Sequence, residues 1–108
     1  MGLKEYLEAQ IAEKNLNAKE IERRSEGKIT DTHIGYILAG KSKNPTIRII
    51  VGLAAGLGVH PIEVFKVAAG VEEPEEGWTA QSLGRAIKKI PNLKPPEIKQ
   101  IKKILKIE

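Results

Sequence analysis

The sequence predicts an all-α protein, with five short helices followed by a helical hairpin. Along most of the chain, apolar residues recur three or four positions apart, which is the spacing of one helix face. Asparagine or threonine precedes several of these segments and glycine follows them, as in capped helices. No segment shows the strict apolar–polar alternation of a half-buried strand.

Residues 1–71 are predicted to form a domain of five helices. Each helix is expected to begin after a capping side chain or a proline and to end at a glycine or asparagine. The expected starts of the second to fifth helices are Asn17, Thr30, the segment Asn44-Pro45-Thr46 with its proline near the first helical position, and Pro61. The expected ends of the five helices are Asn15, Gly27, Gly40, Gly58 and Gly70.

The rest of the chain is predicted to be an acidic linker, 72–78, and an amphipathic helical hairpin, 79–108. Thr79 is expected to cap the first arm, Pro96 to begin the second, and Trp78 to dock the linker onto the domain. The apolar stripes of the two arms contain Leu83, Ile87, Ile90, Ile98, Ile101, Ile104 and Leu105. Two alternatives stay open: the stripes pack on the first domain, or they pack on a second copy and form a homodimer.

Composition excludes several function classes. The chain has 108 residues and no cysteine, and its two histidines have no ligand-like spacing, so no metal or other cofactor is expected. No Ser/His/Asp set, glycine-rich phosphate loop or useful carboxylate pair is present, so neither an enzyme nor a small-molecule substrate is predicted. The longest run without a charged residue or histidine, 49–59, is shorter than the about 20 residues of a membrane span. Without a signal peptide either, a cytoplasmic location and no membrane association are expected.

The net charge of +4 is unevenly distributed. Residues 83–108 contain eight basic and two acidic residues and carry +6, whereas residues 1–82 carry −2. The lysines of the tail form either a second strip that faces DNA or the solvated side of the hairpin. The second interpretation is favoured, with a contribution of the lysines to non-specific attraction of nucleic acid.

The expected third helix has an unusual outer face. Ile34, Ile37 and Leu38 share one side of the helix, which is predicted to be buried. The opposite side and its borders carry Thr32, His33, Gly35, Tyr36 and Ala39. A solvated helix normally presents Glu and Lys, so this face is predicted to be reserved for close approach to another molecule.

Three segments carry a recognisable pattern: LNAKEIERRS, GKITDTHIGYILAGKSKNPT and IRIIVGLAAGLGVHPIEVF. The run I-x-x-I-L-x-G-K-S-K-N-P is the most specific part. Through these segments, residues 3–70 resemble the Cro/cI-type helix-turn-helix domain of λ-repressor-like regulators, the XRE family. The resemblance implies a five-helix domain whose third helix enters the major groove of double-stranded DNA. It also implies a sequence-specific transcriptional regulator of the repressor type.

The resemblance also implies site residues. The base-reading candidates are Asp31, Thr32, Gly35 and Tyr36. The phosphate candidates are Asn17, Lys19, Lys28, Thr30, His33, Lys41, Ser42, Lys43 and Asn44. Asp31 can accept from cytosine N4, and Tyr36 or the Thr32 methyl can touch a thymine methyl. As N-cap, Thr30 would direct the amides of the first turn toward phosphate.

The sequence departs from the family pattern at three points. Ala18 replaces a common phosphate-binding glutamine, Glu22 replaces a common small alanine, and the turn SEGKI is one residue longer than usual. The acidic faces of the first two helices and the non-basic third helix keep an alternative open. The alternative is a protein-interaction module on the same fold, an antitoxin-like or coactivator-like partner binder with little intrinsic DNA specificity.

Overall fold

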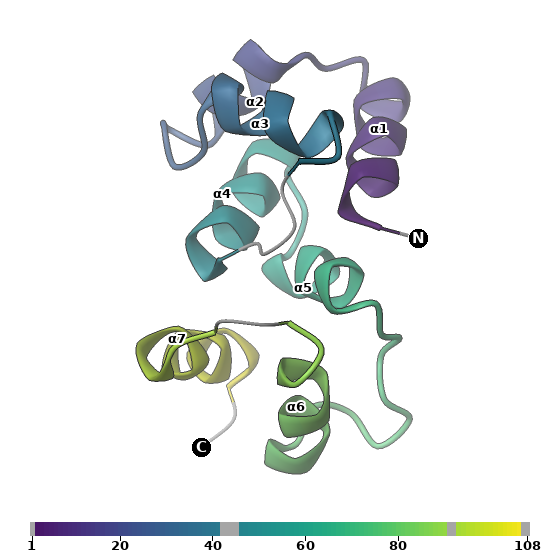
Figure 1. Cartoon of the computed structure of the whole chain (residues 1–108), viewed down its shortest axis with the longest axis vertical. Helices are drawn as coiled ribbons and strands as arrows, with labels where there is room; N and C mark the ends of the chain where they lie inside the picture. The colour runs from purple at the N-terminus through teal and green to yellow at the C-terminus, as the bar shows by residue number, and fades with distance from the viewer. Residues whose placement is uncertain (1, 42–45, 91–92, 107–108) are drawn as a thin grey trace.

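The computed structural model describes residues 2–41, 46–90 and 93–106. These residues form seven helices and contain no strand, so the all-α prediction is confirmed (Figure 1). The helices are α1 (Leu3–Lys14), α2 (Ala18–Arg24), α3 (Asp31–Leu38), α4 (Ile47–Leu57), α5 (Pro61–Ala69), α6 (Ala80–Ile87) and α7 (Pro95–Leu105).

Most helix ends form where the capping signals predict them. The side chains of Asn17, Thr30 and Thr79 accept hydrogen bonds from backbone amides of the first turn of α2, α3 and α6. Gly58 and Gly70 end α4 and α5 with positive φ angles of 72° and 68°, a region that glycine enters without a β-carbon penalty. The short-range signals therefore determine these boundaries.

Two predicted helix starts are wrong. Helix α4 begins at Ile47 after the N-cap Thr46, whose hydroxyl accepts from the Ile49 amide, so Pro45 precedes the cap. Helix α7 begins one residue earlier than predicted, at Pro95. Proline is compatible with the first turn of a helix because its missing N–H has no intrahelical partner there, so the first two positions both accept it.

The hydrophobic core is one continuous cluster that extends from α1 to α7. In the first five helices, the fully buried side chains include Leu7, Ile21, Ile34, Leu53 and Val64. Leu83 and Ala86 of α6, Ile90 after it and Ile101 of α7 belong to the same cluster. The Cα radius of gyration, 13.4 Å, is close to the roughly 13 Å of a single domain of this length.

The predicted C-terminal hairpin needs correction. Helices α6 and α7 both pack on α5, and α7 also packs on α4; these contacts are more extensive than those between α6 and α7. Figure 1 shows both helices beneath α5, at the end of the molecule opposite α2 and α3. In this structure residues of both stripes are buried against the first domain, and packing on a second copy stays a prediction.

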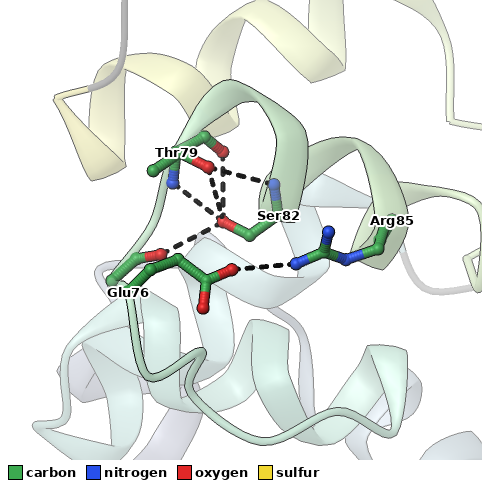
Figure 2. Close-up of polar contacts among 5 residues, drawn as sticks. Glu76, Thr79, Ser82 and Arg85 are labelled. Carbon is green, nitrogen blue, oxygen red and sulfur yellow. Dashed lines mark hydrogen bonds and ion pairs between the residues drawn. The ribbon is translucent and has the colours of Figure 1, made fainter.

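Contacts with α5 and with α6 hold the acidic linker in place. As predicted, Trp78 docks on the domain, with its ring edge-on to Phe65 at a centroid distance of 5.8 Å. The buried Ser82 hydroxyl accepts from the Thr79 amide at 2.8 Å and lies 3.2 Å from the Gly77 carbonyl, while Glu76 pairs with Arg85 at 2.9 Å (Figure 2). These contacts fix the linker against α6, and so fix α6 relative to α5.

Candidate nucleic-acid interface

The solvent-facing side of α3 is small and mostly uncharged. Its exposed residues are Thr32, Gly35, Tyr36 and Ala39, and the Tyr36 residue is 51% exposed. Ile34 and Ile37 are buried on the opposite side, as predicted, whereas Leu38, also predicted to be buried, is only partly so. A β-carbon at Gly35 would meet no described atom within 4 Å, so no packing contact of the chain requires glycine there.

The N-terminus of α3 is occupied by the protein's own side chains. The Thr30 hydroxyl accepts from the His33 amide at 3.1 Å, and the Glu22 carboxylate accepts from the Asp31 amide at 2.8 Å. Two amides of the first turn are therefore already paired, and one partner carries a negative charge that opposes phosphate. Thr30 is the N-cap that was predicted, and its role toward phosphate stays a prediction.

Lys19 and Asp31 form an ion pair across α2 and α3. Their side-chain Nζ and Oδ2 atoms lie 3.0 Å apart, and the Lys19 side chain is 78% exposed. The hydrogen bond from Lys19 lowers the pKa of the Asp31 carboxyl and raises the pKa of the lysine, so both groups are charged at neutral pH. Because an exposed ion pair contributes little to stability, either partner can exchange it for another polar group.

Replacing Lys19 with methionine should raise the pKa of the Asp31 carboxyl toward its ordinary value. The lysine hydrogen bond and charge favour the carboxylate, and folding lowers this pKa. The pair therefore stabilises the protein at neutral pH, and its contribution disappears as the pH falls through the lowered pKa. Titration of the Asp31 side-chain carbon by NMR measures the effect, with Lys4→Met as the control; an unchanged midpoint in Lys19→Met would contradict the assignment.

One ring nitrogen of His33, a predicted phosphate contact, is shielded from solvent. The residue is half-buried, and its ring lies edge-on to Tyr36 with centroids 6.4 Å apart. Its Nε2 atom is shielded from solvent and has no hydrogen-bond partner among the described residues. This nitrogen is thus turned away from any ligand on the surface, and the ring supports Tyr36.

The remaining phosphate candidates are dispersed. Asn17 is exposed but its side chain is bonded to Glu20, and Lys41 is exposed just beyond the C-terminal end of α3. Lys28 lies in the turn between α2 and α3 and lines a groove with α4 and α7. The candidates Ser42, Lys43 and Asn44 lie outside the described residues.

Two residues at this surface were not among the predicted site residues. Lys4 of α1 lies beside Gly40, since a β-carbon on that glycine would be 3.9 Å from the lysine Cδ. Glu22 reaches the start of α3. The sequence does mark Glu22 as unusual, because it stands where a small residue is common in the family that this chain resembles. Lys4 had no sequence signal, because its position depends on how α1 packs on α3.

Comparisons of this chain with protein-family models, with curated proteins and with solved structures give no match. None of the helices in the described part of the chain is both long enough and apolar enough to cross a membrane. The described residues also contain no group of three or more His, Asp or Glu side chains placed to hold a metal ion.

Proposed function

We propose that this chain is a sequence-specific regulator that binds double-stranded DNA, with α2 and α3 acting as a helix-turn-helix. In this proposal α3 lies in the major groove, where Thr32, Gly35 and Tyr36 face the bases. Helices α2 and α3 are packed on each other, and residues 25–30 join them. Two half-sites and a dimer of the protein stay predictions that extend this proposal.

The observation that carries the proposal is Gly35 in the middle of α3. Glycine inside a helix costs about 1 kcal/mol relative to alanine, and no packing contact at this site requires it. Its neighbours on the exposed face are short or aromatic and uncharged. Glycine here lowers the stability of the helix but leaves its surface without a protruding side chain. Such a surface is suited to close approach by a large ligand such as double-stranded DNA.

The distribution of charge around α3 is compatible with this role. Lys4 and Lys41 lie near its C-terminal end, and Lys19 lies near its N-terminal end. A helix in the major groove is flanked by the two phosphate backbones, so cations at its ends can contact phosphate while the uncharged centre meets the bases.

A matched pair of glycine substitutions tests the proposal. Gly84 of α6 also has no described atom within 4 Å of a β-carbon, so Gly35→Gln and Gly84→Gln should both raise the free energy of unfolding, by about 0.5–1 kcal/mol. On the duplex selected from a random library, Gly35→Gln should lose about 1–3 kcal/mol of binding free energy. Gly84→Gln should bind like the parent. Fluorescence anisotropy at several salt concentrations measures the DNA binding of both variants.

A second candidate is a protein-interaction module that uses the same face. The acidic Glu22 and Asp31 at the start of α3 favour it, as does the exposed Tyr36, because tyrosine is enriched in protein interfaces. If the parent selects no duplex sequence and its weak binding is equal in both glutamine variants, the DNA proposal fails and this candidate replaces it.

A further inference from the structure

A groove lies between α4, α7 and the turn that joins α2 and α3, on a different part of the molecule from the exposed residues of α3. Ile47, Val51 and Ile104 form its apolar floor. Lys28, Arg48, Gln100 and Lys103 form its polar rim. Its volume is about 500 Å³, which is within the range of sites for small molecules.

The rim is strongly cationic. It carries three positive charges, and the described lining residues include no carboxylate. Among the described residues, the ion pairs join Lys19 to Asp31, Lys66 to Glu63 and Arg85 to Glu76, so none involves a cation of this rim. These three cations around an apolar floor are complementary to an anionic group attached to an apolar body.

The walls of the groove are held in place by contacts of α7 with α4. The Glu97 carboxylate accepts a hydrogen bond from the Ile47 amide at 3.0 Å, at the N-terminus of α4. Among the acidic residues, Glu97 is the nearest in sequence to the α7 residues that line the groove. Its carboxylate already accepts the hydrogen bond from the Ile47 amide. Ile101, one turn further along α7, is 3% exposed in the common core. The α4 and α7 walls of the groove are therefore held in place relative to each other.

We propose that this groove binds a small organic anion, in which a carboxylate, sulfonate or phosphate is attached to an aromatic or aliphatic body. The anionic group contacts Arg48, Lys103 and Lys28, Gln100 donates a further hydrogen bond, and the apolar body lies on the isoleucine and valine floor. This binding activity is separate from the proposed contact of α3 with DNA.

The test uses 8-anilinonaphthalene-1-sulfonate and its uncharged analogue N-phenyl-1-naphthylamine as probes of the full chain. We expect one saturable site for the sulfonate, and weaker binding of the analogue by about ten-fold or more, because only the sulfonate forms charge-assisted hydrogen bonds. Lys103→Glu should weaken sulfonate binding by about ten-fold and leave the analogue within about two-fold of the parent.

Lys88→Glu is the matched control, because Lys88 is also exposed, lies at the end of α6 and does not line the groove. It should leave the binding of both probes unchanged. Thermal unfolding of the variants, followed by circular dichroism, checks that the exposed substitutions preserve the fold. Equal affinities of the two probes, equal effects of the two variants, or many weak sites would each overturn the proposal.

A final arm distinguishes the small anion from nucleic acid. The bound sulfonate is titrated with a duplex oligonucleotide selected by the parent protein, or with a random-sequence duplex if none is selected. Retention of the probe supports a site for a small molecule. Displacement from the parent would make the groove a nucleic-acid surface and overturn the proposal.

Discussion

Gly56→Ala is expected to lower the free energy of unfolding by about 2 kcal/mol, within the range for overpacked cores. A β-carbon at this position would lie 2.5 Å from Ile21 Cγ2 and 2.6 Å from the Ile21 carbonyl oxygen. Since the oxygen belongs to the backbone of α2, a side-chain rotation alone cannot relieve the contact. Helix α2 would have to move away from α4, and its packing on α3 would change with it.

The sign of the change in stability distinguishes a packing clash from the intrinsic helix preference of alanine. In a helix without tertiary contact, alanine is more favourable than glycine by about 1 kcal/mol. Gly84→Ala in α6 provides the control and should be stabilising, because its β-carbon meets no described atom within 4 Å. Urea unfolding of both variants gives the comparison. Stabilisation by both substitutions would show that α2 and α4 do not approach closely at Gly56.

Leu83→Ala is expected to cost about 2–5 kcal/mol of stability, as for other fully buried leucines. Leu83 lies in α6, yet it belongs to the same cluster as the residues of α1 to α5. The loss should therefore resemble that of Leu53→Ala in α4, which is also fully buried. Both variants should unfold in one cooperative transition, measured by denaturation with two optical probes.

Two results would contradict this view of the tail. A separate early transition in Leu83→Ala, with the main transition at the parental midpoint, would show that residues 79–106 fold independently. A midpoint that rises with protein concentration would show that the apolar stripe is stabilised by a second copy. Sedimentation equilibrium of the parent measures the predicted homodimer directly.

Local signals in the sequence were sufficient for the helices and most of their ends. Asn17, Thr30 and Thr79 cap the helices that follow them, because a capping side chain bonds amides only two or three residues away. Periodicity also identified the buried face of α3 and exposed Tyr36. The prediction failed at the start of α4, where Thr46 is the N-cap and the helix begins two positions after the proline in sequence.

Tertiary structure alone decided what each face contacts. A helical stripe shows that Leu83 and Ile101 must be buried, but burial is non-directional and does not specify whether α5 or a second chain covers them. The same limit applies to polar groups far apart in sequence. Helix packing brings the Glu22 carboxylate of α2 to the start of α3 and the Glu97 carboxylate of α7 to the start of α4. It also places Lys28 in one groove with Lys103. The sequence by itself determined the helices and the outer face of α3, whereas helix packing decided which charges surround that face and which form a separate groove.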